Sequence, residues 1–282
     1  MAEFCYSFEF FPPKTEKAGA RLEAALDELE TLNPAFVSIT YGAGGTTRER
    51  TFKTVENILK NRSVDPATHL TCVNASRAEI DEIVQGYLDM GITQFVALRG
   101  DPPGSVDGIY TPHPEGYAFG SDLVAGIRSR SPNAKISVSA YPERHPESAD
   151  WDAEIDNLKR KADAGANQAI TQFFFRSEDF LRLQERVADA GMDIPIIPGI
   201  MLQPNFDGLK RMAAMCGVDV PGHLARRFVQ AQGDMDQCRD ITVDYFSGLI
   251  QELQNGGVGD FHLYTLNTAP IAAEVVHNIR GQ

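Results

Sequence analysis

The sequence lacks any apolar run that approaches the ~20 residues needed to span a bilayer, and the residues after Met1 lead directly into a strand pattern instead of a signal peptide. It is also short of basic residues, with 26 Lys and Arg against 39 Asp and Glu and a formal net charge of −13. This balance argues against a general surface for nucleic acid or anionic membranes. We therefore expect a cytoplasmic protein with neither nucleic acid nor a membrane as a partner. A phosphate-bearing ligand would need a locally basic site.

The four cysteines are scattered and show no paired spacing of a zinc site or a redox motif. No spacing of His, Asp and Glu predicts a metal site, and neither GxSxG nor a Cys–His arrangement indicates a nucleophile. The glycine fingerprint GxGxxG of dinucleotide-binding folds is missing as well, since residues 41–45 come nearest and do not fit it. We expect no metal and no Rossmann domain.

Strand and helix patterns alternate along the 282 residues, a length close to the roughly 250 residues of a (β/α)8 barrel. Eight strands are predicted, at Cys5–Phe11, Ala35–Tyr41, Thr68–Val73, Gln94–Leu98, Lys135–Tyr141, Gln168–Phe175, Ile194–Ile200 and Asp260–Leu266. The helices are predicted at Thr15–Thr31, Thr47–Asn61, Ser76–Met90, Gly120–Ser129, Asp150–Ala164, Ser177–Ala190, Asn205–Cys216 and Ala269–Ile279. Eight such units without a dinucleotide fingerprint favour an α/β fold with one closed TIM barrel, a single domain over residues 1–282, rather than a doubly wound sheet. A loop at 101–119 and an extra helical block at 221–255 interrupt the alternation.

Two opposite charges follow the fourth predicted strand. Arg99 and Asp101 are separated by Gly100, and a Pro-Pro-Gly turn comes next. Ligands bind at strand exits in folds built from parallel strands. Gly100 would let a flat ligand lie against the backbone between a cation and a carboxylate. The alternative is an Arg–Asp pair that only ties down the loop.

Glu9 lies on the first predicted strand. Alternation of side chains puts it with Ser7 on the face opposite Tyr6, Phe8 and Phe10. Partial desolvation among aromatic neighbours would favour the protonated carboxyl, which makes Glu9 a candidate proton donor near neutral pH. A buried structural ion pair is the alternative.

Other polar residues on the predicted strands and helices are candidate site residues only if they lie together with further polar groups. Gln172 places an amide in an apolar strand, where it needs either a ligand or a neighbouring strand as partner. His262 is interpreted as a satisfied core residue. The densest basic run, Lys159–Lys161, is either a solvated helix face or a holder for a diphosphate or ribose.

Nine stretches, ordered along nearly the whole chain, carry a resemblance to a known family: Ser7–Pro13, Val37–Gly42, His69–Cys72, Leu98–Asp101, Tyr141–Glu143 with His145–Glu147, Lys161 through Gly165–Asn167, Ile170–Phe175, Ile197–Ile200 and Phe261–Asn267. Together they resemble the methylenetetrahydrofolate reductase family in its short bacterial form. The resemblance implies a flavin-containing barrel that passes a hydride from NADH or NADPH to FAD and then to 5,10-methylenetetrahydrofolate. The product would be 5-methyltetrahydrofolate, in one-carbon and methionine metabolism, and nicotinamide and folate would take turns at one flavin face.

The resemblance also implies roles for individual residues. Glu9 matches the general acid that helps to open the five-membered ring, and Asp101 matches a carboxylate near both flavin and pterin. Gln172 matches an amide shared by folate and nicotinamide, Thr40 a nicotinamide contact and Tyr264 a substrate contact. The matching flavin contacts are Tyr41, Ala43, His69, Arg99, Gly100, Asp101, Phe119, Gly120, Tyr141, His145, Glu154, Asn157, Arg160 and Lys161.

The chain departs from the family pattern near both ligands. On the flavin side, Phe119-Gly120 replaces a usual Tyr-Ala pair, and Glu154 replaces an acidic contact that is often Asp. We expect flavin binding to survive these changes.

On the folate side, Gly208 and Met212 stand where the family's helix usually offers a Gln and an aromatic, and Thr268 stands where an Arg is common. These changes leave open how the folate is held. They also leave a second function open, a flavin-binding barrel that acts as an electron-transfer or scaffold subunit without folate reduction.

A third function, a folate methyltransferase barrel without flavin, would need a thiol or metal site that the scattered cysteines do not supply. The chain ends just after its last predicted helix, so no regulatory domain is expected. The sequence does not distinguish NADH from NADPH, and it leaves a homo-oligomer open.

Overall fold

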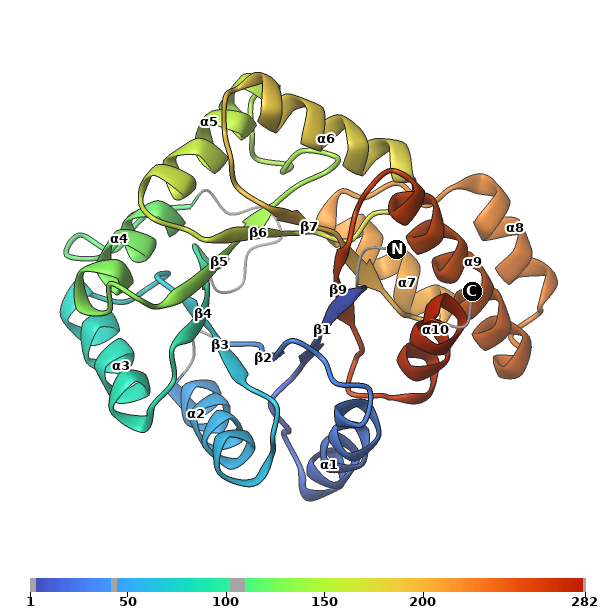
Figure 1. The fold of residues 1–282 in the computed structure, drawn as a ribbon, viewed down its shortest axis with the longest axis horizontal. Coiled ribbons are helices and arrows are strands. Elements are labelled where there is room, and N and C mark those ends of the chain that lie inside the picture. Colours follow the sequence, from blue (N-terminus) through green and yellow to red (C-terminus); the bar gives the residue numbers. More distant parts are fainter. Residues whose placement is uncertain (1–3, 42–44, 102–109, 281–282) are drawn as a thin grey trace.

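The computed structural model describes residues 4–41, 45–101 and 110–280, and this part of the chain forms nine strands and ten helices. The strands form a central ring with the helices outside it (Figure 1). The strands are β1 (Cys5–Phe10), β2 (Val37–Ile39), β3 (Pro66–Thr71), β4 (Gln94–Leu98), β5 (Lys135–Ala140), β6 (Gln168–Thr171), β7 (Ile196–Ile197), β8 (Gly199–Met201) and β9 (Asp260–Tyr264). The helices are α1 (Glu16–Glu30), α2 (Gly45–Asn61), α3 (Arg77–Met90), α4 (Gly120–Arg130), α5 (Trp151–Asp163), α6 (Ser177–Asp189), α7 (Phe206–Cys216), α8 (Gly222–Gln230), α9 (Met235–Asn255) and α10 (Pro270–Arg280).

The predicted TIM barrel is confirmed. Every strand pairing is parallel, and the order in the sheet is β7-β6-β5-β4-β3-β2-β1-β9-β8. The two end strands, β7 and β8, follow one another in the chain, so the sheet curls round until its ends nearly meet.

The prediction of one strand over residues 194–200 was wrong. Pro198 has no backbone N–H and divides the segment into β7, which pairs with β6, and β8, which pairs with β9. The carbonyl of Pro198 still accepts a hydrogen bond of 2.9 Å from the backbone N of His262. The segment on either side of Pro198 therefore connects β6 to β9 and completes the barrel.

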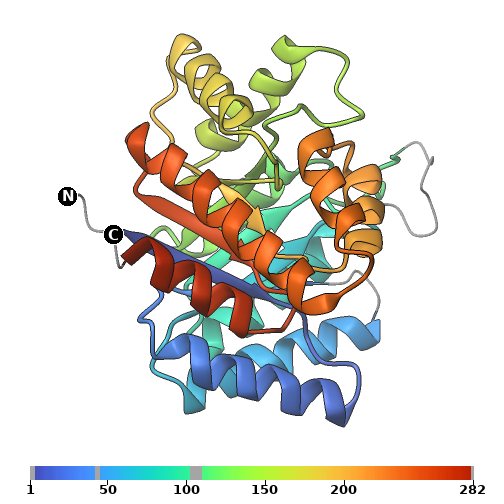
Figure 2. The same ribbon diagram turned by 90° about the vertical axis from the view of Figure 1, so that its right-hand side faces the viewer.

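Several predicted strands extend beyond the observed ones, and the end of the sixth differs most. β6 ends at Thr171, so Phe173–Phe175 lie beyond the strand, although all three are buried. The extra helical block predicted at 221–255 is confirmed as two helices, α8 and α9, and α9 lies beside α10 (Figure 2).

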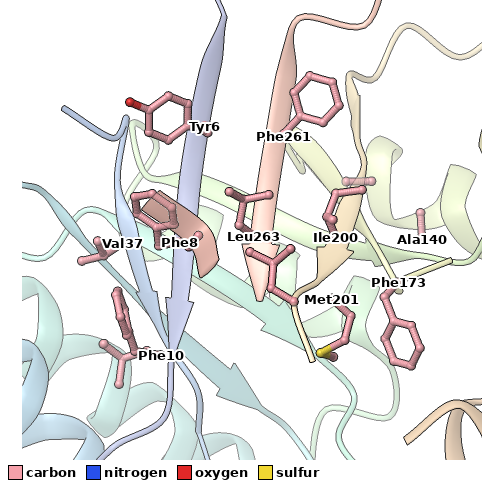
Figure 3. Packing of buried hydrophobic residues seen from close by; sticks show 14 of the residues in the cluster. Tyr6, Phe8, Phe10, Val37, Ala140, Phe173, Ile200, Met201, Phe261 and Leu263 are labelled. Atoms are coloured by element: carbon pink, nitrogen blue, oxygen red, sulfur yellow. The ribbon is translucent and has the colours of Figure 1, made fainter. Parts of the chain in front are cut away.

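Side chains of β1 point alternately to the outer and the inner face of the barrel. Tyr6, Phe8 and Phe10 are buried in the layer between barrel and helices (Figure 3), where the Tyr6 hydroxyl donates to the carbonyl of Leu32. Ser7 and Glu9 face the barrel interior. The predicted alternation is confirmed, and it delivers Glu9 to the inside.

Side-chain caps set the start of the two helices that border the functional site. Asp150 caps α5 by accepting a 2.8 Å hydrogen bond from the N of Ala153, and Asn205 caps α7 by accepting one of 2.7 Å from the N of Gly208. None of the helices in the described ranges is both long and apolar enough to cross a membrane.

Candidate functional site

A cavity of about 640 Å³ opens at the carboxyl ends of the strands. It is lined by sixteen of the predicted site residues: Glu9, Thr40, Tyr41, His69, Arg99, Gly100, Asp101, Phe119, Gly120, Tyr141, His145, Asn157, Arg160, Lys161, Gln172 and Tyr264. Parallel strands bring their carboxyl ends to one face of a barrel, so residues far apart in the sequence meet there. Ala43 and residues 102–109 of the long loop lie outside the described residues.

Glu9 faces two histidines at the base of this cavity. Its Oε2 atom lies 3.3 Å from Nε2 of His69 and 3.6 Å from Nε2 of His262, and its side chain is 14% exposed. Burial lowers the pKa of His69 to about 4, so this imidazole is neutral near pH 7. Among the described residues no Lys or Arg pairs with Glu9. The arrangement fits a proton donor better than a permanent ion pair with a strong cation.

His262 is completely buried and is held from both ring nitrogens. Ser7 Oγ lies 2.7 Å from Nδ1, Ser38 Oγ lies 3.4 Å from Nε2, and the ring of Phe36 stacks at 5.8 Å. The interpretation of His262 as a satisfied core residue is confirmed. Sequence reasoning missed that it also borders Glu9 and the cavity.

Arg99 is fixed mainly by two groups other than Asp101. Its Nη1 atom lies 2.5 Å from Oε2 of Glu147, and its guanidinium stacks 4.5 Å from the ring centroid of Tyr110. The nearest separation to Asp101 is 3.8 Å, and the Asp101 side chain is 88% exposed. The alternative of an Arg–Asp pair that ties down the loop is therefore poorly supported.

Gly100, between these charges, has a φ of +81°. A Cβ there would lie 2.7 Å from Cγ1 of Val73 and 2.8 Å from Cβ of Thr71. Only glycine fits this turn, which keeps the backbone of β4's exit pressed against the end of β3.

Lys161 reaches the cavity from α5 and is buried. Its ammonium donates to the backbone oxygen of Ser139 at 2.8 Å and to the hydroxyl of Ser139 at 3.1 Å, and it lies 5.9 Å from the ring centroid of Tyr141. Burial lowers the pKa of Lys161 to about 8. An ammonium has three N–H donors, so one remains beyond the two that Ser139 accepts.

Glu154 lies behind the cavity wall instead of on it. It is buried, and its Oε2 atom accepts hydrogen bonds from the backbone N of His145 at 3.1 Å and from Ser148 Oγ at 2.5 Å. The carboxylate thus braces the loop that carries His145 and Glu147. A direct flavin contact from Glu154 stays a prediction.

Gln172 and Tyr264 contribute polar groups near Glu9. The Gln172 Oε1 atom accepts a 3.0 Å hydrogen bond from the N of Phe173, and the amide group lies on the cavity wall. The Tyr264 hydroxyl donates to the backbone oxygen of Thr171 at 2.7 Å, and burial raises its pKa well above the usual value. Tyr264 is therefore a neutral phenol held in place by β6.

Sequence reasoning missed several residues of the cavity. Glu147 binds Arg99, and Ser139 binds Lys161. The alternation of Ser137 and Ser139 on the inward face of β5 could have indicated Ser139. Met201 and Cys216 were also missed, and they form an apolar side of the cavity together with Met212, a position that the resemblance had already indicated. Within residues 4–41, 45–101 and 110–280, no group of three or more His, Cys, Asp or Glu side chains could hold a metal ion.

Comparison with known proteins gives consistent matches over nearly the whole chain. The family model described as methylenetetrahydrofolate reductase matches residues 1–280. A 5,10-methylenetetrahydrofolate reductase of Salmonella typhimurium is 42% identical over 274 residues, 97% of this chain and 90% of the relative. Methylenetetrahydrofolate reductase (NADH) 1 of Arabidopsis thaliana is 33% identical over an alignment of 289 residues that covers 99% of this chain and 49% of that relative.

A solved structure shows the same fold at low identity. It is an uncharacterised protein from Clostridium thermocellum, described as binding two copies of 5-methyl-5,6,7,8-tetrahydrofolic acid. It matches with a TM-score of 0.66 and 15% identity, covering 99% of this chain and 95% of that one. At this identity the likeness shows the barrel fold alone.

Proposed function

Because the chain belongs to the methylenetetrahydrofolate reductase family, we propose that it reduces 5,10-methylenetetrahydrofolate to 5-methyltetrahydrofolate, with FAD as cofactor and NADH or NADPH as reductant. The observation that carries the proposal is one cavity that unites Glu9, Asp101 and Gln172 with the basic wall of Arg160 and Lys161. The relatives' names supply the folate reaction. The product would serve one-carbon and methionine metabolism in the cytoplasm.

The residues of the cavity fit FAD. Arg160 and Lys161 supply positive charge in a chain of net charge −13, which is what a diphosphate requires. The buried hydroxyl of Tyr41 has no hydrogen-bond partner among the described residues, and Lys161 retains a donor. When bound, FAD would supply a carrier that takes a hydride from the nicotinamide and gives it to the folate in a second, separate step.

Glu9 would supply the proton of the reaction. The overall change adds one hydride and one proton to the folate, and opening of its five-membered ring leaves a cationic iminium. Protonation of the substrate by Glu9 would promote that opening, since the carboxyl borders the cavity beside a neutral His69. The contacts of Glu9 with His69 and His262 hold its carboxyl group at the base of the cavity.

Asp101 and Gln172 would orient and stabilise the substrate. The exposed carboxylate of Asp101 on the cavity wall would favour the cationic iminium. The amide of Gln172 offers donors and an acceptor to folate and nicotinamide in turn, and Thr40 lies on the same wall for the nicotinamide.

The test separates the two half-reactions. The purified protein is loaded with FAD, reduced anaerobically by NADH or NADPH, and then mixed with 5,10-methylenetetrahydrofolate while the flavin absorbance is recorded. Bleaching by one nicotinamide followed by rapid recolouring with the folate supports the proposal and identifies the reductant. Bleaching without recolouring would instead support the flavin-binding barrel with an electron-transfer or scaffold role.

A further inference from the structure

The first turn of α7 contains Gly208, and the carboxamide of Gln203 lies where a side chain at position 208 would begin. A Cβ on Gly208 would lie 3.1 Å from Nε2 and 3.3 Å from Cδ of Gln203, and 3.2 Å from Oδ1 of Asn205. Glycine is a poor helix former, and at this position it leaves room for the carboxamide of Gln203. The family usually has a glutamine at position 208, and in this chain the amide of Gln203, from the preceding loop, lies next to that position.

The carboxamide of Gln203 is held in a defined orientation. Pro204 follows it and restricts its backbone to extended conformations. The Oε1 atom accepts a 3.0 Å hydrogen bond from the N of Asn205, and the Nε2 atom lies 3.9 Å from Sδ of Met212, a weak acceptor. An amide has two N–H donors, and among the described residues Gln203 has no strong acceptor for either.

The register of the strands shows where this amide lies relative to the substrate. Glu9 and Met201 are both register partners of Tyr264, on opposite sides of β9. Gln203 follows Met201, the last residue of β8, by two residues and is half-buried, and its Nε2 atom lies 3.9 Å from Sδ of Met212, which lines the cavity. A pterin bound near Glu9 and Gln172 would direct the rest of the folate, an aryl amide and its glutamate, toward this mouth.

We propose that Gln203 is a substrate-binding residue that donates a hydrogen bond to the aryl amide or glutamate part of the folate, in place of a side chain at 208. This inference rests on the proposed function. It explains how the chain binds folate despite Gly208, because the amide is supplied from position 203 to the same place. Met212 beside it offers a polarisable thioether to the aryl ring.

The experiment measures folate and nicotinamide steps separately in the FAD-loaded enzyme. Gln203→Ala should raise the KM for 5,10-methylenetetrahydrofolate and the Kd for 5-methyltetrahydrofolate about fivefold, the effect of one neutral hydrogen bond of about 1 kcal/mol. Its kcat, and its rate of nicotinamide oxidation with an artificial acceptor, should stay close to wild type. Gln85→Ala, which removes an exposed amide paired with Asp89 on α3, is the matched control and should change neither constant.

A second variant tests whether the two positions share one amide site. In the Gln203→Ala background, Gly208→Gln enters the space that the amide has vacated and should lower the KM again by at least half of the increase. A double variant no better than Gln203→Ala, an unchanged KM in Gln203→Ala, or equal losses in both half-reactions would each overturn the inference. If the wild-type enzyme neither binds nor reduces folate, both the proposed function and the inference about Gln203 fail. If Gln203→Ala has an unchanged KM and normal turnover, only the role of Gln203 is rejected.

Discussion

The Oε2 atom of Glu9 lies 3.3 Å from Nε2 of His69, although their strands, β1 and β3, are separated by β2 in the sheet. Side chains that point into a barrel converge, which allows residues from strands two places apart to meet. The contact puts a carboxyl group against a neutral imidazole at the base of the cavity. It provides the setting for a proton donor that the sequence pattern could only suggest.

Glu9→Gln should abolish folate reduction while sparing FAD binding and nicotinamide oxidation. The amide has nearly the same shape as the carboxyl group but cannot donate a catalytic proton, and the loss should be at least about 100-fold. Single-turnover measurement of each half-reaction checks this. Normal formation of methyltetrahydrofolate in the variant would remove Glu9 from the mechanism.

The buried His69 should make the protein sensitive to acid. Its pKa is about 4 when folded against an ordinary 6.5, so the unfolded chain binds more protons between these values. The free energy of unfolding should therefore fall as the pH drops from 6.5 to 4, by up to about 3 kcal/mol from this residue. His69→Gln should flatten that part of the curve in urea unfolding at a series of pH values. Equal slopes in variant and wild type would contradict the assignment.

Lys161 should give opposite pH effects on stability and on FAD binding. Its folded pKa of about 8 lies below the ordinary 10.5, so the apoprotein should gain stability as the pH rises from 8 to 10.5. Its affinity for FAD should weaken over the same range, because the neutral amine no longer attracts a diphosphate. Lys161→Met should remove both trends in titrations of the apoprotein. Lys159→Met, on the exposed side of α5, is the control and should keep them.

Asp101→Asn should slow the folate half-reaction more than the nicotinamide half-reaction. Removing the charge withdraws stabilisation from a cationic iminium, while Arg99 remains anchored by Glu147 at 2.5 Å. Stopped-flow rates for reduction and reoxidation of the bound flavin give the comparison. Equal slowing of both steps would reject the charge-based role.

Gly199→Ala should destabilise the barrel by more than about 2 kcal/mol. The new Cβ would lie 2.2 Å from the backbone oxygen of Thr171 and 2.7 Å from the ring and hydroxyl of Tyr264, whose hydrogen bond to Thr171 it would disturb. Gly248→Ala in α9, where nothing lies within 4 Å, is the control and should stabilise by up to about 1 kcal/mol. Thermal unfolding distinguishes the two. A Gly199→Ala protein as stable as wild type would show that β8 can move away from β6.

Local patterns made most of the fold predictable. Alternation along Cys5–Phe10 placed Tyr6 and Phe8 outside the barrel and Glu9 inside, because the period of two is a property of any strand. The division of residues 194–200 at Pro198 was missed, since a short apolar run reads as one strand until its two partners are known.

The sequence by itself determined the barrel class, the inward direction of Glu9 and, largely through the family resemblance, half of the residues that line the cavity, because periodicity, glycine positions and ordered motifs are local properties of the chain. Only the tertiary structure decided which partner each of them has. Arg99 is bound by Glu147 more closely than by its neighbour Asp101, Glu154 braces a loop behind the wall, and Gln203 fills the space beside Gly208. Such pairings depend on distances between segments remote in the chain, and they are set when the strands close and the helices pack around them.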